Sequence, residues 1–493
     1  MPLRLLAAGA ALAFTAMASA APILAPPAEL SADLRQYVRV PAGRIALTHV
    51  RVIDGTGAAP AEDRTVLIDG RRIAAIQPAS DPLPAGYRAL DLGGASVLPG
   101  IVGMHDHLFY IARPNLDSEG HAEGPLVVPE MPFSAPRLYL ANGVTTMRTT
   151  GSVEPYTDIN LKAEIDGGRL IGPHMDVTSP FLEGSDTPFV QMHRITSPDD
   201  ARRMVAFWAQ QGATSFKAYT DITRAELKAA IDEAHRRGFK LTGHLCSVTY
   251  PEAARLGIDD LEHGFFVNTQ LDPGKQPDKC SDGGGTPTLL AMKPGRQEAN
   301  ALIKLLVEKR VAITSTLPVF EQSLALHAPL EARVMAVMTP QAREAYLYSR
   351  NRAASRGSTP AGQQLAEAYR NELGLERQFV AAGGLLLAGP DPTGNGGVIP
   401  GFGNQRAIEL LVEAGFSPLE AIRIGTLNGA TYLGLADRIG SIAPGKNADL
   451  MVLRGNPAAD IRDIEKVEIV FKDGTGFDTA KLLESVSGRY GQY

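Results

Sequence analysis

Cysteine and tryptophan are scarce in this chain of 493 residues, and neither charge sign is in large excess. Two cysteines cannot build a disulfide scaffold, so a large hydrophobic core must hold the fold together. The formal net charge of -6 excludes the basic surface of a nucleic-acid-binding protein. Hydrophobic residues make up 44% and charged residues 21%, which excludes a largely disordered chain. A mean hydropathy of -0.05 excludes a polytopic membrane protein.

The first twenty residues have the composition of a targeting segment. Residues 1–20 carry an early Arg4, an apolar run too short to span a bilayer well, and Ala-Ser-Ala at positions 18–20. This pattern predicts a secretory signal peptide, although a buried N-terminal helix is the alternative. We expect an exported protein, periplasmic or secreted, without membrane association after signal removal. Residues 21–40 are predicted to be a proline-containing linker.

Both ends of the mature chain are rich in predicted strands. Short β-branched or aliphatic runs end in Gly, Asp or Pro, as strands and hairpin turns do. These runs lie at residues 44–55, 65–76, 88–100, 447–456 and 467–474. Neither end alone makes a sufficient core, so we expect one discontinuous β-sandwich domain from residues 41–98 and 436–478. Residues 479–493 are then a C-terminal tail.

The middle of the chain, residues 99–435, alternates apolar runs with amphipathic helical patterns. The expected strands lie at residues 100–107, 143–151, 170–179, 213–221, 240–246, 259–266, 311–320 and 385–392. Eight such strands predict an α/β fold of the (β/α)₈ TIM-barrel type, with a doubly wound open sheet as the rival. Polar residues gather toward the carboxyl ends of these strands, where barrel enzymes place their chemistry, and this favours the barrel.

His105 and His107 lie two residues apart on the first expected strand. Period-two geometry directs both side chains to one face, so both can reach one metal ion. Lys217 lies within the fourth strand, where an ammonium group is costly unless it is paired or modified. The two histidines are either a polar strand end or a pair of metal ligands. Lys217 either forms a salt bridge or is carbamylated by CO2.

Three further residues end later strands. His244 and His263 end the fifth and sixth strands, and Asp391 ends the eighth. Singly, each is equally a core histidine or a turn-forming aspartate. Together with the other three residues they occupy matching strand ends, which accident rarely produces. The pattern therefore predicts a metal site.

The segments that carry these residues resemble the metal-dependent amidohydrolase superfamily. They read PGIVGMHDH, SFKAY, TGHLC, LEHG, AGPD and LNGATYLGLADRIGSIAPGKNADLMVL. The resemblance runs from about residue 45 to residue 475 and is greatest to the imidazolonepropionase-like branch, which includes Xaa-Pro dipeptidases. The sequence departs from the family pattern at three places. Gly103 stands where an Asp is usual, Cys246 stands where relatives often have His, and the helix near residue 405 begins with QRAI.

The resemblance implies a binuclear hydrolase with two divalent ions, zinc being the expected metal. His105 and His107 would bind one ion and His244 and His263 the other, while carbamylated Lys217 would bridge them and Asp391 would be both ligand and proton shuttle. A metal-bridging hydroxide would then attack an amide bond of a dipeptide such as Xaa-Pro, or of an N-acyl amino acid. His244 or Tyr219 would help to stabilise the oxyanion, although Tyr219 is equally a packed aromatic.

Other functions and residues stay open from the sequence. The same centre supports a lactonase or phosphotriesterase, a deaminase is a weaker possibility, and a non-catalytic scaffold is the alternative outside enzymes. A homo-oligomer is compatible with the resemblance.

Long loops are expected at residues 108–133, 180–196, 267–296 and 320–362. Cys246 and Cys280 either form a disulfide or stay as thiols. Candidate substrate-carboxylate ligands are Arg148, Arg194 and His193, while His121, His174, His235 and His327 are expected to be surface or packing residues.

Overall fold

The computed structural model describes residues 22–111, 128–154, 156–184, 191–393 and 398–491. The predicted signal peptide and His121 therefore lie outside the described residues. None of the helices within the described ranges is both long and apolar enough to cross a membrane.

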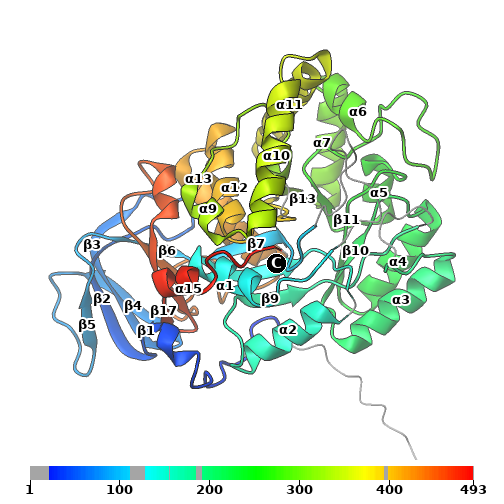
Figure 1. Cartoon of the computed structure of the whole chain (residues 1–493). Helices are drawn as coiled ribbons and strands as arrows, with labels where there is room; N and C mark the ends of the chain where they lie inside the picture. The colour runs from blue at the N-terminus through cyan, green and yellow to red at the C-terminus, as the bar shows by residue number, and fades with distance from the viewer. Residues whose placement is uncertain (1–21, 112–127, 155, 185–190, 394–397, 492–493) are drawn as a thin grey trace, which may run out of the picture.

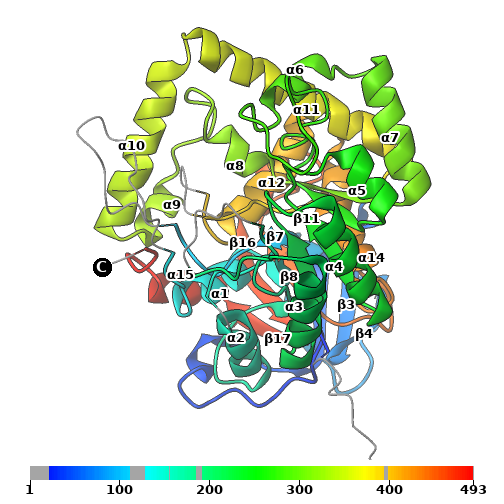
Figure 2. The same ribbon diagram turned by 90° about the vertical axis from the view of Figure 1, so that its right-hand side faces the viewer.

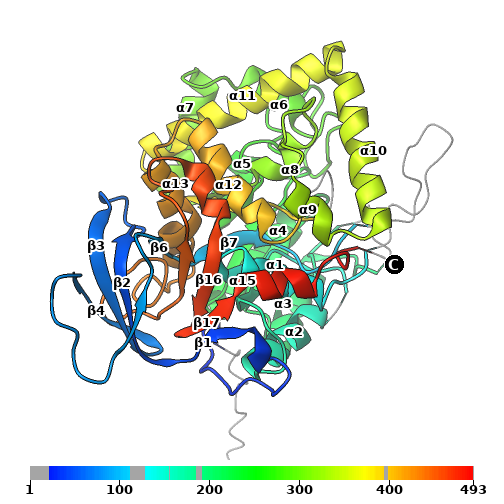
Figure 3. The same cartoon turned by 60° about the vertical axis from the view of Figure 1, so that its left-hand side comes forward.

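Strands from both ends of the chain form one nine-stranded sheet. Its order is β1-β17-β16-β15-β6-β2-β3-β4, and β5 pairs with β2. The early strands β2–β4 and the late strands β16 and β17 belong to this sheet, and all of them are labelled in Figure 3. The strands are β1 Val38–Val40, β2 Gly43–Val52, β3 Ala61–Gly70, β4 Arg72–Pro78, β5 Arg88–Asp91, β6 Ser96–Pro99, β15 Leu450–Leu453, β16 Val467–Lys472 and β17 Thr475–Asp478.

The two chain ends meet where β15 pairs with β6. This pairing is antiparallel and puts Leu450 opposite Pro99 and Val452 opposite Val97. Apolar residues of both ends, such as Ile45, Val66 and Ile469, share one hydrophobic cluster. Neither end could bury this apolar surface alone, which explains why segments about 350 residues apart form one sheet.

The middle of the chain forms two parallel sheets. One has five strands in the order β10-β11-β12-β13-β14 and the other has three in the order β7-β8-β9. All eight strands expected from the sequence are present. They are β7 Ile101–Asp106, β8 Val144–Thr149, β9 His174–Val177, β10 Ser215–Ala218, β11 Lys240–Gly243, β12 Asp260–Glu262, β13 Ala312–Ser315 and β14 Leu386–Ala388.

Contacts join the two parallel sheets on both sides. Parallel bridges pair Thr178 with Ser215 and Leu182 with Ala218, next to β9 and β10. On the other side, the Asp391 amide donates to the His105 carbonyl at 3.1 Å. A Cβ on Gly389 would lie 2.3 Å from the His105 backbone nitrogen, so glycine permits this approach of β14 to β7. The carboxyl ends of β7 and β14 therefore lie next to each other.

Helices connect and cover these strands (Figures 1 and 2). Local signals in the sequence start two of the amphipathic helices: Ser197 caps α3, and Thr223 forms a capping box with Glu226 at the start of α4. The helices are α1 Ser134–Ala141, α2 Thr157–Asp166, α3 Pro198–Gln211, α4 Arg224–Arg236, α5 Tyr250–Leu256, α6 Thr286–Ala291, α7 Gln297–Lys309, α8 Leu317–Glu321, α9 Ala332–Val337, α10 Pro340–Arg356, α11 Pro360–Ala381, α12 Phe402–Glu413, α13 Pro418–Arg423, α14 Gly429–Tyr432 and α15 Thr479–Ser485, with short 3₁₀ and π segments at Arg35–Tyr37, Ile424–Asn428 and Ile461–Glu465.

The prediction of a loop at residues 320–362 is wrong, because most of this segment is helical. It contains α9 and α10, and α11 begins at its end (Figure 2). The start signals were there, since Thr339-Pro340 and Thr359-Pro360 each place a capping threonine before a proline. However, α10 buries only Ala342, Tyr346 and Ala353, so it lacks the apolar stripe by which helices are recognised in a sequence.

Cys246 and Cys280 form a disulfide, so the first of the two alternatives for the cysteines is the correct one. Cys246 follows β11 and Cys280 lies in the segment between β12 and α6, 34 residues along the chain. The bond therefore ties this segment to the end of the strand that carries His244.

We expect the double variant Cys246→Ser/Cys280→Ser to lower the free energy of unfolding by about 3–4 kcal/mol, the chain-entropy value for a closed loop of this length. Urea denaturation of both proteins under non-oxidising conditions measures the difference. Wild-type protein unfolded in a reducing agent is the control and should approach the variant. Equal midpoints for oxidised wild type and variant would contradict the expectation.

Candidate metal centre

His105, His107 and Asp391 meet where β7 and β14 lie side by side. The His107 Nε2 atom is 3.2 Å from Asp391 Oδ1, and the His105 Nε2 atom is 3.5 Å from the same oxygen. Both histidines are at most 3% exposed. One ligand atom from each of the three residues lies within 4.8 Å of the others, which is close enough for all three to bind one ion.

Lys217 points from β10 into the same space. Its Nζ lies 3.3 Å from His105 Nε2, and the side chain is 1% exposed. The ammonium group also lies 5.2 Å from the ring of Phe181 and 5.8 Å from that of Tyr219. Burial lowers the pKa of Lys217 to about 8, because the charged form is poorly solvated there.

His244 and His263 complete the cluster from the ends of β11 and β12. The ring centroids of His263 and His105 are 4.6 Å apart, and those of His244 and His263 are 4.3 Å apart. Burial lowers the pKa of His244 to about 3 and that of His263 well below its usual value. Both rings are therefore neutral at physiological pH, which is the form that binds a metal.

The structure thus brings together the six residues that the sequence proposed as metal ligands. Neutral imidazoles, a carboxylate and a buried amine are donor chemistry that fits divalent metal ions. Tyr219 lies beside them, with its ring 4.9 Å from that of His244. Burial raises the pKa of Tyr219, so its hydroxyl stays protonated.

Groups behind the histidines orient the rings, and the sequence did not single them out. Glu262 Oε2 lies 2.7 Å from His105 Nδ1, and the Gly151 carbonyl lies 3.1 Å from His107 Nδ1. Each contact engages Nδ1 and leaves Nε2 directed toward Asp391. Such outer partners fix the tautomer and orientation of ligand histidines.

Arg148 is a buried structural residue, not a ligand for substrate. Its guanidinium donates to Asp260 at 2.7 Å and to Glu262 at 2.8 Å. Glu262 in turn contacts His105 Nδ1, so Arg148 helps to position the His105 ring through Glu262. Asp260 and Glu262 stand two residues apart on a buried strand, and that spacing was the available sign of an inward-facing carboxylate pair.

Two residues of the cluster have a left-handed backbone. The φ angles of His263 and Asp391 are 67° and 55°. Residues other than glycine rarely adopt this conformation, and it costs free energy that the surrounding structure must offset. Its occurrence at two of the six candidate ligands agrees with a functional site.

The departures from the family pattern are accommodated locally. The Asp106 carboxylate fills the space beside Gly103, where a Cβ would lie 1.8 Å from Asp106 Oδ2, and it accepts a hydrogen bond from Asn404. Cys246 is in the disulfide. Gln405 donates to backbone carbonyls, and Arg406 pairs with Glu321. These residues have structural partners.

The other histidines have acidic neighbours. His193, one of the candidate substrate ligands, is half exposed and lies 3.0 Å from Asp200, and Arg194 is exposed. His235 pairs with Asp259 and His327 pairs with Glu321. His174 is buried between two carboxylates, so it is a packing residue and not a surface one.

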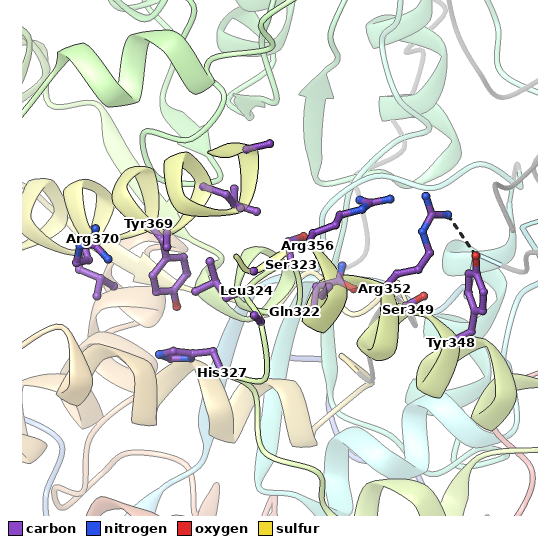
Figure 4. Close-up of a pocket in the computed structure, with 18 of the residues that line it drawn as sticks. Gln322, Ser323, Leu324, His327, Tyr348, Ser349, Arg352, Arg356, Tyr369 and Arg370 are labelled. Atoms are coloured by element: carbon purple, nitrogen blue, oxygen red, sulfur yellow. Dashed lines mark hydrogen bonds between the residues drawn. The ribbon is translucent and has the colours of Figure 1, made fainter. Parts of the chain in front are cut away.

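A cavity of about 750 Å³ lies between the segment that follows α8 and the helices α10 and α11 (Figure 4). Leu324 and Tyr369 contribute apolar surface, and Arg352, Arg356 and Arg370 contribute positive charge. Aromatic rings connect it to the metal ligands: Phe320 lies 5.8 Å from His263 and 3.7 Å from Phe266, which lies 5.9 Å from Tyr369. A series of aromatic rings therefore runs from the cavity lining at Tyr369 to His263.

Comparisons with known proteins give matches to part of the chain. Residues 391–476 match the amidohydrolase family model. Adenine deaminase 1 of Jannaschia sp. is 39% identical over 70 residues, 14% of this chain and 11% of that protein. The imidazolonepropionase of Deinococcus deserti is 38% identical over 89 residues, 18% of this chain and 21% of that protein. The matches thus span about a tenth and a fifth of these curated relatives.

Solved structures match over most of the chain. A Xaa-Pro dipeptidase with bound methionine aligns with a TM-score of 0.64 at 20% identity, covering 88% of this chain and 100% of that one. Ochratoxinase of A. niger aligns with a TM-score of 0.63 at 18% identity, covering 89% and 96%. At these identities the likeness shows the fold. Fold and site together are those of an α/β protein whose residues 391–476 match the amidohydrolase family.

Within that class, the prolidase-like structures and the imidazolonepropionase match are the relatives that the sequence motifs had indicated. The resemblance to the metal-dependent amidohydrolases is confirmed.

Proposed function

We propose that this protein is a binuclear metal-dependent hydrolase that cleaves an amide bond, in a dipeptide such as Xaa-Pro or in an N-acyl amino acid. The observation that carries the proposal is the convergence of His105, His107, Lys217, His263 and Asp391 at one buried point, with His244 beside them. The amidohydrolase match and the Xaa-Pro dipeptidase-like fold support the amide bond as the target.

The proposal includes the closed form of the barrel. We propose that β7–β14 form a (β/α)₈ barrel, with the sheet from residues 41–98 and 436–478 as a separate β-sandwich domain. The bridges between β9 and β10 and the hydrogen bond from Asp391 to His105 support closure. A closed barrel would place all six ligands at the carboxyl ends of its strands, where barrel enzymes have their active sites.

The proposed ligand sets follow from the contacts. His105, His107 and Asp391 would hold one ion, His244 and His263 would hold the second, and carbamylated Lys217 would join them. Two bound divalent ions, zinc being the expected metal, would supply a Lewis acid for the substrate carbonyl and lower the pKa of water. Carbamylation requires an unprotonated amine, and the burial that lowers the pKa of Lys217 to about 8 increases the unprotonated fraction near neutral pH.

The residues of the chain would move the protons. Burial alone would raise the pKa of Asp391, but the electrostatic interaction with His105 and the hydrogen bond from His107 hold it well below the usual value. Asp391 is therefore ionised and can accept a proton from the attacking water and deliver it to the leaving nitrogen. Tyr219 keeps its hydroxyl proton and can donate a hydrogen bond to the developing oxyanion, as can the ring N–H of neutral His244.

We also propose that the mature protein acts outside the cytoplasm on a small molecule or dipeptide, as a monomer or homo-oligomer. The disulfide between Cys246 and Cys280 supports export, because disulfides persist in oxidising compartments.

Lys217→Ala should lose bound metal and amidase activity together, because it removes the group proposed to join the two ions. Elemental analysis measures the metal content of both proteins. The centre should hold about two metal ions per chain in wild type and fewer in the variant. Activity is measured on a panel of Xaa-Pro and other dipeptides, N-acyl amino acids, lactones and phosphotriesters. Lys228→Ala, at an exposed pair with Asp232, is the matched control.

The outcomes separate the candidate functions. Hydrolysis of dipeptides or N-acyl amino acids that a chelator abolishes supports the proposal, whereas turnover confined to lactones or phosphotriesters replaces it by the second hydrolase class. Full activity in Lys217→Ala would exclude the bridging role of the lysine. Metal-free protein without any turnover would indicate a scaffold.

A further inference from the structure

A second cluster of buried ligand-type side chains lies away from the candidate centre. It consists of His174, the first residue of β9, Asp449, directly before β15, and Asp473, between β16 and β17. The three residues are 1%, 4% and 5% exposed. His174 stands at the amino end of its strand, whereas the candidate centre uses carboxyl ends. The two clusters are therefore separate sites.

The distances suit a single ion. His174 Nε2 lies 3.2 Å from Asp473 Oδ2 and 3.8 Å from Asp449 Oδ2. One ligand atom from each of the three residues lies within 4.8 Å of the others, the same separation found for His105, His107 and Asp391. An ion between them would be reached by a nitrogen and two oxygens.

The ring nitrogens of buried His174 are poorly satisfied. Nε2 lies 3.2 Å from the Asp473 carboxylate, but neither nitrogen makes a hydrogen bond of good geometry to any described residue. A buried polar atom that is not properly hydrogen-bonded destabilises the fold, so native structures seldom retain one without a reason. A metal ion would use the lone pair of Nε2 and remove this cost.

The carboxylates are only partly compensated. Arg71 pairs with Asp473 at 2.7 Å. The Lys472 amine is directed to the Gly172 carbonyl at 2.9 Å. Within the described ranges, His174 is the only basic side chain in ion-pair contact with Asp449. A second cation is therefore expected near Asp449, and either a metal ion or a proton on His174 can provide it.

The surroundings orient the carboxylates as an outer shell would. Asn447 donates to Asp449 and to Asp473, each at 3.4 Å, and the Asp473 amide donates to Asp449 Oδ1 at 2.7 Å. Asp473 has a φ of 48°, a left-handed turn that positions its side chain. Outer contacts of this kind accompany built metal sites.

There is also room for a water ligand. A cavity of about 60 Å³ adjoins the cluster and is lined by His174, Asp473 and the segment 25–28. This exceeds the volume of one water molecule, about 30 Å³. A fourth ligand from solvent could complete a tetrahedral site.

We infer that His174, Asp449 and Asp473 bind a structural Zn²⁺ ion that fastens β9 to the nine-stranded sheet. One imidazole and two carboxylates are ligands that zinc accepts, at about 2.0–2.2 Å after a small inward movement of each side chain. Because β15–β17 come from the far end of the chain, the ion joins segments that sequence separates by about 275 residues or more. It stabilises this junction and takes no part in catalysis.

Zinc-edge anomalous diffraction from crystals of the wild-type protein grown with zinc tests the inference directly. We expect a peak within bonding distance of His174 Nε2 and of both carboxylates. No peak there, in crystals that show zinc between His105 and His263, would overturn this inference and leave the proposed function intact. A peak at His174 alone would support the inference and count against the proposed function.

A variant pair tests the same point in solution. His174→Ala should lose one zinc equivalent relative to wild type, unfold at a lower temperature, and keep its activity per folded molecule. His235→Ala, which removes a histidine from an exposed pair with Asp259, should keep its zinc. If His174→Ala folds and binds as much zinc as wild type, the cluster is a salt bridge of protonated His174. If it fails to fold, the diffraction experiment decides.

Discussion

Asp391→Asn is expected to lower kcat on the best amide substrate by about 10²–10⁴-fold, the usual contribution of a positioned proton-transfer group. The substitution keeps the shape of the side chain but removes the charge that faces His105 and His107. It also removes the only acid among the six clustered residues. Steady-state kinetics on protein of verified metal content measures the effect.

The matched control is Asp199→Asn, at an exposed aspartate on α3 that pairs with Arg202. Its kcat should equal that of wild type. Asp391→Asn with bound metal and unchanged kcat would refute the proton-transfer role. Loss of metal together with kcat would assign Asp391 mainly as a ligand, and restoring the metal at high concentration separates the two effects.

Arg148→Met should destabilise the protein by about 3–5 kcal/mol, the range for breaking a buried ion pair from one side. The guanidinium is 1% exposed and bonds to Asp260 and Glu262. Both carboxylates are buried, so water cannot take the place of the guanidinium. Burial and the charge of Glu262 already raise the pKa of Asp260 to about 6, so removing Arg148 leaves two crowded carboxylates. Urea denaturation followed by circular dichroism gives the change in free energy of unfolding.

Arg202→Met is the matched control, because its ion pair with Asp199 is exposed, and exposed pairs contribute about 0–1 kcal/mol. A comparable loss of stability in both variants would contradict the assigned role of Arg148. If the Arg148 variant folds, its metal affinity should also fall, since Glu262 would no longer be held against His105.

Much of the site could be predicted from the sequence because its ligands end strands. His105 and His107 show the period of two, and His244, His263 and Asp391 each follow a short apolar run. Parallel strands bring their carboxyl ends to one edge, so positions far apart in the chain become neighbours by rule. The helices α3 and α4 were equally predictable, because their caps and apolar stripes are local signals.

Other features depend on pairings that no local pattern encodes. Arg148 was considered as a substrate ligand because a guanidinium can hold a carboxylate by charge-assisted hydrogen bonds, and only the tertiary structure shows that it binds Asp260 and Glu262 instead. The segment that forms helix α10 was predicted to be a loop because it lacks an apolar stripe; the helix buries only three of its residues. His174 had no visible partner, since Asp449 and Asp473 reach it from the far end of the chain.

The sequence by itself determined which segments form strands and which side chains stand at their ends, since strand periodicity and helix capping act over a few residues. The tertiary structure alone decided which buried charges compensate each other. Electrostatic partners are chosen by distance in space inside a medium of low dielectric constant, and chain separation does not enter that choice.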